Sequence, residues 1–522
     1  MFSLYRTPLG VLFGRATAAL PVDLLRVFVG LLSFFYFLHT WQEAADISAP
    51  DGLIDHALVL DIYWFTRLGF FYPGISLAAL KFIFLVATLA SWAVILGWRP
   101  KLFAVLLFAI AVSTYRWNFL VTYVDDAIMH LMLFWLLLLP VGRTLTLSGW
   151  WRDRRGCWTH WMKERVPGTA IGCFLCNLAL IYLVAGLWKL TSPMWRDGSA
   201  LFAVLKLPVS YQPDFWQAEH QPFLKIMTWA SLVVEPLIPL ALLLRRGHPV
   251  KWLLLAGLVG LHGGIVATMK LPFANLACLG GSVVIFQEEL MHWLARGARP
   301  DSVTAAPMSA GWCGRIAVAF VFVLSLAMLR YVPAGGTVEP DRYGAAELSI
   351  DPRGSGGLGA MHKPLYCALW FAGIAQEYQL FNWIDVRNHR LRYQITLQEG
   401  VTRRQIDPAE FFPATNRSVL LQLYLHDLCW FKVPADRNAE LKRTLALRFA
   451  QRYSRAHCEQ HGIVTVTTTV ERVTAAEPRR IEHGPEVLFS FTLRDGDAVL
   501  RQAPVAHFPA RLAPAAPPGA PF

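Results

Sequence analysis

Charged residues are scarce in this chain of 522 residues: they make up 16% of it, whereas hydrophobic residues make up 55%. This composition excludes an ordinary soluble domain, in which about a quarter of the residues are charged. The eight cysteines lack the paired spacing of a zinc site, the glycines form no phosphate-binding loop, and no repeat is present. The sequence therefore predicts an integral membrane protein without a metal site.

The hydrophobic residues gather in blocks that mostly hold roughly 18 to 25 residues, enough to cross about 30 Å of hydrocarbon as a helix. We expect about nine such spans, the fourth and eighth of them short. The blocks cover residues 24–41, 74–98, 102–123, 127–141, 171–189, 224–244, 250–269, 276–287 and 316–332. The predicted fold class is a mainly α-helical polytopic membrane protein, in which residues 1–335 form the helical membrane domain.

Basic and acidic residues alternate between the loops that join these blocks. Lysine and arginine gather before the first block and after the second, fourth, sixth and eighth, whereas residues 43–61 after the first block are rich in acids. Short cytoplasmic loops keep lysine and arginine, so the N-terminus is expected in the cytoplasm of a plasma or inner membrane. The first block lacks a cleavable signal pattern and is expected to stay as an anchor. An odd number of spans then places the C-terminal region on the extracytoplasmic side.

Residues 336–503 are polar and long enough for an extracytoplasmic domain with its own core. The β-branched and aromatic residues of 390–397, 463–473 and 487–493 predict strands, and the apolar spacing of 436–462 predicts an amphipathic helix with a closing glycine. This domain is therefore expected to be α+β. Residues 504–522 are rich in proline and alanine and are predicted to be disordered.

Further expectations concern contacts of this domain and of the chain as a whole. The dense apolar and aromatic residues of 369–383 predict a segment that docks on the membrane region. Cys367, Cys429 and Cys458 allow one disulfide in an oxidising compartment. The net charge of +12 is assigned to cytoplasmic loops and to a basic outer domain that faces a lipid bilayer, and no nucleic-acid partner is expected.

Three polar residues lie within or at the end of apolar blocks. Lys189 ends its block, so it is either an anchor whose head reaches water or a desolvated base. Glu235 lies near the middle of its block and needs a proton or a partner, which His262 or Lys189 would supply. His262 is flanked by glycines, and a packing role is as compatible with that pattern as a functional one.

Two acidic residues, Asp125 and Asp126, precede the fourth block. They suit the N-terminus of a helix at the water boundary, where carboxylates complement the helix dipole. Asp126 and His130 are four residues apart, so on a helix they share a face and would form a carboxylate–imidazole pair. Capping and acid–base chemistry are both open to Asp126 at this level.

The order of several short segments resembles the HTTM (horizontally transferred transmembrane) domain family, which includes the vitamin K-dependent γ-carboxylases. The segments are VTYVDDAIMHLMLFWLLLLP, AGLWKLTSPMWRDG, VVEPLIPLALLLRRG, LHGGIVATMKLPF and AQEYQLFNW, and the resemblance covers residues 22–383. It implies a polytopic protein with a cytoplasmic N-terminus and an extracytoplasmic C-terminal domain. This agrees with the orientation that the charges predict.

The resemblance also implies a chemistry. Lys189 would deprotonate reduced vitamin K or menaquinone, and the oxygenated quinone would remove a γ-proton from a glutamate in a peptide or protein client, to which carbon dioxide adds. Asp126 occupies the place of a histidine that assists at the quinone oxygen in the carboxylases, and His262 matches a family histidine. Trp195 lies one residue farther from the lysine than in the carboxylase pattern.

Three functions therefore follow from the sequence. The first is a quinone-dependent, carboxylase-like enzyme with Lys189, Asp126 and His262 as catalytic candidates, and with His130 and Glu235 as further buried polar candidates. The second is a non-catalytic membrane factor that binds lipid or a client protein, similar to lipase-maturation proteins. The third, ranked last, is a transporter, for which an internal repeat would be expected.

Overall fold

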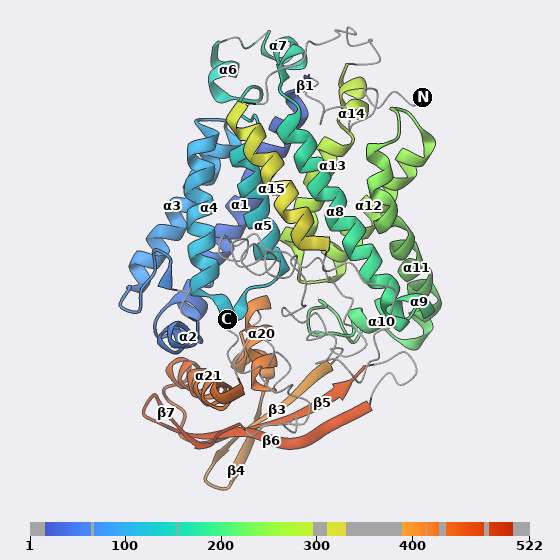
Figure 1. Ribbon diagram of the computed structural model, residues 1–522. Helices are drawn as coiled ribbons and strands as arrows, with labels where there is room; N and C mark the ends of the chain where they lie inside the picture. Colours follow the sequence, from blue (N-terminus) through green and yellow to red (C-terminus); the bar gives the residue numbers. More distant parts are fainter. Residues whose placement is uncertain are drawn as a thin grey trace, which may run out of the picture.

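The computed structural model describes residues 16–63, 67–152, 154, 156–295, 311–329, 389–413, 415–426, 435–473 and 480–504. In these residues, a bundle of long helices carries at one end a smaller domain built on a β-sheet (Figure 1). The coarse prediction of a mainly helical protein with a C-terminal α+β domain is confirmed. The predicted domain boundary at 335/336 and the predicted disordered tail from residue 505 onward lie outside the described residues.

Every predicted apolar block overlaps a long helix of the described chain. These helices are α1 (Leu20–Gln42), α3 (Leu77–Ile95), α4 (Pro100–Trp117), α5 (Val124–Leu138), α8 (Thr169–Thr191), α11 (Gln221–Leu237), α12 (Pro249–Thr268), α13 (Pro272–Ile285) and α15 (Gly311–Leu329). Among the described residues, six stretches are long and apolar enough to cross a membrane: α1, α3, α4, α8, α12 and Ala218–Leu242, which contains α11. Such helices are typical of an integral membrane protein.

Short elements join and cover the long helices. Within the described ranges they are β1 (Thr17–Ala18), a π-helical turn (Ala44–Ser48), α2 (His56–Ile62), a 3-10 turn (Phe119–Val121), α6 (Leu147–Arg152), α7 (Cys157–Lys163), β2 (Arg165–Val166), α9 (Pro193–Asp197), α10 (Ala200–Leu205), two 3-10 turns (Ala218–His220 and Ile238–Leu242) and α14 (Gln287–Leu294). Strands β1 and β2 pair antiparallel. They tie the entry of α1 to the entry of α8.

A proline and a glycine fix the contact between α8 and α11. Pro236 lies inside α11, which ends at the next residue and continues as a 3-10 turn, because proline has no N–H to donate and its ring crowds the preceding turn. Gly186 of α8 faces this break, and a Cβ atom added there would lie 2.7 Å from Pro236 Cδ. The missing side chain therefore lets the two backbones approach closely. One helical turn farther along α8 is Lys189.

The C-terminal domain contains a five-stranded antiparallel sheet in the order β4-β3-β5-β6-β7. Its elements are β3 (His389–Glu399), β4 (Thr402–Ile406), α19 (Pro408–Phe411), α20 (Asn416–Leu425), α21 (Ala435–Ala456), β5 (Gly462–Arg472), β6 (Arg480–Arg494) and β7 (Asp497–Gln502). In the register, Ile395 pairs with Val466 and Leu397 with Val464, and all four are buried. The alternation of the sequence thus turns one face of the sheet toward a core.

The predicted strands correspond to β3, β5 and β6, and the predicted amphipathic helix corresponds to α21. The helix ends at Ala456 and not at Gly462. Gly462 instead opens β5 with a φ of +140°, a backbone conformation that favours glycine. Strands β4 and β7 were not predicted. They are short edge strands with mainly exposed residues, so they lack the apolar alternation that marks a strand.

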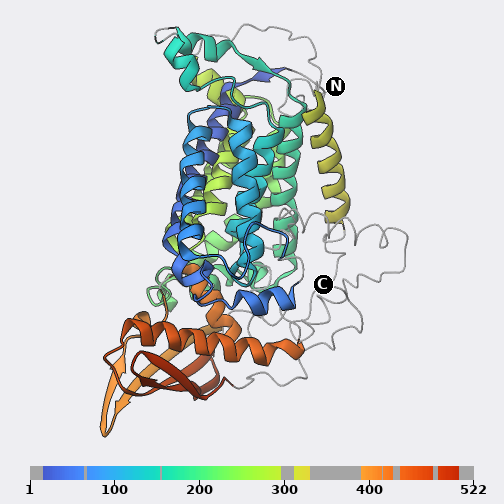
Figure 2. The same ribbon diagram turned by 90° about the vertical axis from the view of Figure 1, so that its left-hand side faces the viewer.

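Helices α20 and α21 lie between the sheet and the bundle (Figures 1 and 2). One hydrophobic cluster joins Leu445 and Phe449 of α21 to Leu53, Leu58 and Phe119 from loops of the bundle. The domain therefore docks through a shared apolar core. The segment 369–383, which was expected to dock, lies outside the described residues.

Opposite charges surround this apolar contact. Arginines of α21 pair with aspartates of the acidic loop that follows α1, and the pairs are Arg437–Asp61, Arg448–Asp55, Arg452–Asp46 and Arg455–Asp51. On the other side, Arg390 and Arg392 of β3 pair with Asp214 in the loop before α11. The acidic loop that the sequence singled out, residues 43–61, is therefore a docking partner of the C-terminal domain, and the loop with Asp214 is a second one that was not predicted.

Candidate functional site

One buried polar group in the bundle is centred on Lys189, near the end of α8 that faces the C-terminal domain. The ammonium of Lys189 forms an ion pair with Oε1 of Glu235 on α11, and the two side chains are only 5% and 6% exposed. The close approach at Gly186 and Pro236 brings the two helices together at this height. Of the two partners that the sequence offered for Glu235, the structure therefore supplies Lys189.

The ion pair has two further contacts, one from α9 and one from α11. The ring of Trp195 on α9 lies 4.7 Å from Lys189 Nζ, a distance at which a cation is attracted by an aromatic face. Ser231 donates a weak hydrogen bond of 3.4 Å to Glu235 Oε1. The other oxygen, Oε2, is buried and has no hydrogen-bond partner among the described residues. A buried carboxylate oxygen without a donor is unfavourable, and Glu289 Oε1, in the ion pair with Lys251, is in the same condition.

A chain of hydrogen bonds lies next to this pair. His262 Nε2 is 2.7 Å from the Tyr182 hydroxyl, and His262 Nδ1 is 2.8 Å from Asn275 Oδ1. The Asn275 amide nitrogen donates to the carbonyl of Leu271, so its oxygen faces the imidazole and accepts a hydrogen bond from Nδ1–H. Nε2 of a neutral His262 is then an acceptor, and the Tyr182 hydroxyl donates to it. Lys189 lies near enough for its charge to act on His262.

We call Lys189, Glu235, Tyr182, His262 and Asn275 the lysine cluster. It joins four helices, α8, α11, α12 and α13, that the sequence separates by loops. Tyr182 and Asn275 were not predicted as site residues. Asn275 was weakly indicated by the sequence, because an amide side chain three residues into an apolar helix needs a hydrogen-bond partner.

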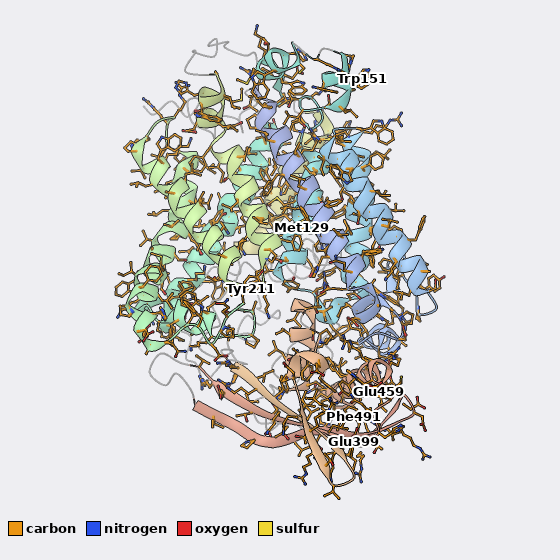
Figure 3. The ribbon with its side chains drawn as sticks, turned by 180° about the vertical axis from the view of Figure 1, so that it is seen from behind. Met129, Trp151, Tyr211, Glu399, Glu459 and Phe491 are labelled. Atoms are coloured by element: carbon orange, nitrogen blue, oxygen red, sulfur yellow. The ribbon has the colours of Figure 1, made fainter. Side chains whose placement is uncertain are left out.

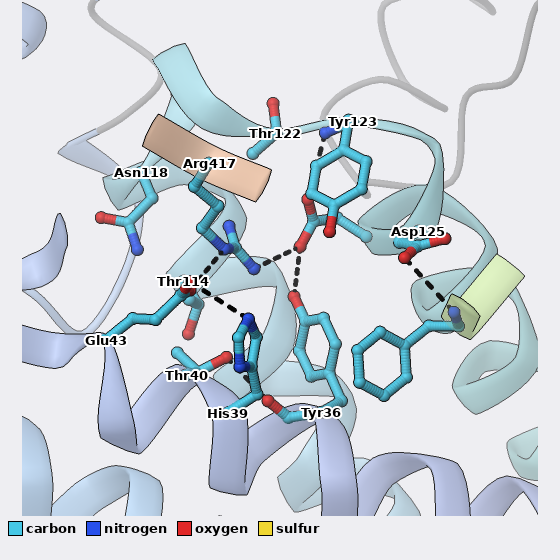
Figure 4. A network of polar contacts seen from close by, with 12 residues as sticks. Tyr36, His39, Thr40, Glu43, Thr114, Asn118, Thr122, Tyr123, Asp125 and Arg417 are labelled. Carbon is cyan, nitrogen blue, oxygen red and sulfur yellow. Dashed lines mark hydrogen bonds and ion pairs between the residues drawn. The ribbon is translucent and has the colours of Figure 1, made fainter. Parts of the chain in front are cut away.

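A second polar group lies where α20 meets the bundle (Figure 4). Arg417 of α20 reaches between α1 and α5, and it pairs with Asp126 at 2.9 Å and with Glu43 at 3.4 Å. The Tyr36 hydroxyl donates to the same Asp126 oxygen at 2.5 Å, and His39 lies 3.1 Å from Glu43. We call these five residues the arginine cluster.

The arginine cluster is buried except for His39, whose side chain is 40% exposed, and it contains two carboxylates and one guanidinium. Arg417 is only 3% exposed, and burial disfavours its charge, but the carboxylate of Asp126 outweighs this and keeps the pKa of Arg417 well above its usual value. Two carboxylates and one guanidinium share the site, and Tyr36 satisfies the more buried acid. Paired and hydrogen-bonded charges of this kind hold a structure together because each would be costly alone.

Both members of the acidic pair before α5 cap helices, whereas the acid–base role of Asp126 stays a prediction. Asp126 Oδ2 accepts the backbone N–H of Tyr123 and caps α5. Asp125 accepts the N–H groups of Phe273 and Ala274 at 3.3 and 2.8 Å and so caps α13. The other oxygen of Asp126, Oδ1, accepts hydrogen bonds from Arg417 and Tyr36.

His130, the expected partner of Asp126, is buried farther along α5. Its ring packs edge-on against Tyr115, with centroids 5.3 Å apart. Asp126 and His130 share a helix, as predicted, but the carboxylate of Asp126 is directed to the arginine cluster. The sequence did not identify Arg417 as a site residue, because it lies 291 residues away from Asp126.

Within the described residues, no three histidine, cysteine or acidic side chains are placed to hold a metal ion. Cys458 is an exposed thiol, whereas Cys367 and Cys429 lie outside the described residues. No family model matches this chain, and no curated protein or solved structure matches it either. The function is therefore argued from the two polar clusters themselves.

Proposed function

We propose that this chain is a quinone-dependent membrane enzyme similar to the vitamin K-dependent γ-carboxylases of the HTTM family, with the lysine cluster as its site. The observation that carries the proposal is Glu235 Oε2. It is a buried carboxylate oxygen that lacks a donor among the described residues, and it belongs to the carboxylate that pairs with Lys189. A hydroxyl group of a lipid-soluble ligand is the donor that would complete it.

In the Lys189–Glu235 pair, one proton of the ammonium can be transferred to the carboxylate. Transfer of a proton from the ammonium to the carboxylate would leave a neutral amine beside a neutral acid. When the proton rests on Glu235, Lys189 is a neutral amine and can accept a proton from a bound hydroxyl. Glu235 thus gives Lys189 a way to act as a base without an exchange with water.

The residues of the cluster fit a reduced quinone. Lys189 Nζ and Glu235 Oε2 would hold its hydroxyl group, and the Trp195 ring offers an aromatic face beside them. A bound reduced quinone supplies an acidic hydroxyl and, with oxygen, the strong base for carboxylation of a peptide glutamate that the resemblance implies. His262, fixed by Asn275, keeps the Tyr182 hydroxyl oriented at the edge of the same site.

We also propose how the chain is oriented in the membrane. Nine spans would result if α5, α13 and α15 also cross the membrane, with the N-terminus in the cytoplasm and the C-terminal domain outside. This membrane orientation is supported by the arginines of the α6–α7 end and by the acidic loop at the opposite end of the bundle. A reporter fused after residue 332 should be active only outside the cytoplasm, and activity in the cytoplasm would refute the orientation.

The experiment that tests the function uses the purified full-length protein. Lipid extraction should recover a quinone in a stoichiometric amount. Reduced menaquinone or phylloquinone, oxygen, bicarbonate and a glutamate peptide should yield quinone epoxide and fixed carbon dioxide, measured separately. Glu235→Gln, which keeps an acceptor for Lys189 but cannot take its proton, should lower both products. A wild-type protein that makes neither product with either quinone would refute the proposal.

The second candidate is a non-catalytic membrane factor that binds lipid or a client protein. The arginine cluster favours it, because Asp126, which stands where the resemblance implies an assisting histidine, is held in ion pairs that tie the two domains together. This candidate predicts a bound client and no epoxide. A transporter rests only on the buried Glu235 and the broken helix α11, and transport by proteoliposomes would be required to support it.

A further inference from the structure

The hairpin of α6 and α7 lies at the end of the bundle opposite the C-terminal domain (Figures 1 and 2). Three of its tryptophans are strongly exposed: Trp150 by 41%, Trp151 by 68% and Trp158 by 45%. Trp151 projects from this end of the molecule in Figure 3. Arg152 and Arg154 lie between them in the sequence and are also exposed. Large aromatic side chains that remain exposed together mark a contact surface.

This exposure belongs to a fixed structure. Leu147 N–H donates to the Leu96 carbonyl at 2.8 Å, and Gly149 N–H donates to the Thr146 hydroxyl at 3.1 Å. Trp161 of α7 is buried beneath the hairpin, and the β1–β2 pairing holds the chain directly after α7 against the start of α1. The hairpin therefore turns one aromatic ring inward and presents the other three outward.

The exposed rings are combined with positive charge. The guanidinium of Arg154 lies 4.7 Å from the Trp150 ring and 5.2 Å from the Trp151 ring. An indole ring is suited to the headgroup level of a bilayer, because it has an apolar body and one polar N–H. A guanidinium beside it matches a phosphate oxygen pair in shape and charge. Both features of the hairpin point to the same ligand chemistry.

The distribution of other tryptophans identifies the partner as a membrane. Trp98 between α3 and α4 is 60% exposed, Trp293 on α14 is 74% exposed, and Trp312 at the start of α15 is 77% exposed. Lys101 bonds to Cys313, which places the start of α15 beside the start of α4. The exposed rings thus lie around the ends of several helices at one level. A protein partner would bind a patch of exposed residues on one side of the bundle. A bilayer surrounds the bundle, so it matches tryptophans that are distributed around it.

We propose that the α6–α7 hairpin binds the headgroups of anionic phospholipids. Arg152 and Arg154 contact lipid phosphate, and Trp151 and Trp158 lie at the level of the headgroups. This surface is independent of the lysine cluster, which lies at the other end of α8.

The test compares phospholipids on the detergent-solubilised full-length protein. Dioleoylphosphatidylglycerol should bind about 25-fold more tightly than dioleoylphosphatidylcholine, measured by native mass spectrometry and by the midpoint of thermal unfolding. The double variant Arg152→Gln/Arg154→Gln should lose this preference, because each basic residue near an anionic surface contributes a factor of roughly five. The matched control is Arg403→Gln/Arg404→Gln on the exposed β4, which should keep it.

Two further measurements keep the proposal open to refutation if the double variant fails to fold. The preference of the wild-type protein should weaken between low salt and about 0.5 M NaCl, since screening acts on exposed charges. Inorganic phosphate alone should not stabilise the protein. Equal binding of the two lipids, a preference that salt leaves unchanged, or stabilisation by phosphate that matches the lipid would each overturn the assignment.

Discussion

The lysine cluster and the arginine cluster contain similar side chains: a cation, a tyrosine, a histidine, and one carboxylate in the first or two in the second. In the arginine cluster the guanidinium has fixed carboxylate partners on both sides, and the tyrosine donates to one of these carboxylates. In the lysine cluster the tyrosine is turned to His262, and one oxygen of Glu235 is left without a donor among the described residues. Burial alone therefore does not mark a reactive site. Both oxygens of Glu43 in the arginine cluster also lack a hydrogen-bond donor among the described residues, but they lie 3.1 Å from His39 and 3.4 Å from Arg417, which suits a link between the domains. In the lysine cluster, Lys189 pairs with Oε1 of Glu235, and Oε2 is the oxygen that a ligand would complete.

The choice of cation agrees with this difference. Arginine stays protonated at any pH that a protein meets and binds carboxylates with a planar fork, which suits a permanent ion pair. Lysine loses its proton readily when it is buried, which suits a base. The two clusters also differ in their connections. The lysine cluster lies within the bundle, whereas the arginine cluster links the bundle to α20.

The largest expected effect is that of Lys189→Arg. Arginine keeps the charge that pairs with Glu235 but does not yield a neutral base, so product formation should fall at least about a hundredfold. The matched control is Lys251→Arg, because Lys251 forms the other buried lysine–glutamate pair, with Glu289 at 2.9 Å, outside the lysine cluster. Equal activity of the Lys189 and Lys251 variants would remove the contrast between the clusters.

Arg417→Ala should have the largest effect on stability. It leaves Asp126 and Glu43 as buried carboxylates without their cation, which typically costs about 3 to 5 kcal/mol. The expected result is a lower midpoint of thermal unfolding and faster proteolysis between the domains. Arg417→Lys should restore part of the loss, since it returns the charge without the fork. If Arg417→Ala abolishes product formation but leaves stability unchanged, the arginine cluster is not a structural link.

The folded domain interface should weaken as the pH falls, and His56 is one cause. His56 is stacked on Trp117 with ring centroids 4.0 Å apart, and burial lowers its pKa from 6.5 to about 3. Between these values the unfolded chain binds the proton and the folded chain does not, so this contribution to stability is complete above pH 6.5 and decreases as the pH falls toward 3. At pH 5 the loss should be about 2 kcal/mol.

Thermal or denaturant unfolding at several pH values measures this slope. His56→Phe keeps an aromatic ring on Trp117 but carries no proton, so its stability should change less between pH 6.5 and 5 than that of the wild-type protein. An equal slope in both proteins would assign the acid sensitivity to other groups.

The smallest effect is expected for the exposed charge pairs of α21. Arg455 and Asp51 are 48% and 68% exposed, and exposed pairs contribute about 0 to 1 kcal/mol each because water and salt screen them. Arg455→Gln should therefore shift the unfolding midpoint by no more than a degree or two, as measured beside Arg417→Ala. A loss as large as that of Arg417→Ala would show that the docking depends on the outer pairs and not on the buried cluster.

The long helices, three of the five strands of the C-terminal sheet and α21 could be predicted from the sequence, because hydrophobic runs and alternating β-branched residues act over a few neighbouring residues. The sequence also identified Lys189, Glu235 and His262 as polar residues that need partners within apolar helices. Only the tertiary structure decided which partners they have. Gly186 and Pro236 bring α8 and α11 close enough to pair Lys189 with Glu235, a contact between segments that the sequence offered only as one of two choices.

The arginine cluster depended wholly on tertiary structure. Asp126 was consistent with a helix cap and with an acid–base group, since both need only a carboxylate at the start of a helix. Its ion pair with Arg417 joins residues 291 positions apart in different domains, and no local pattern encodes such a distance. The docking of α20 and α21 on the acidic loop brings them together, because the apolar side chains between the two domains are buried only in that arrangement.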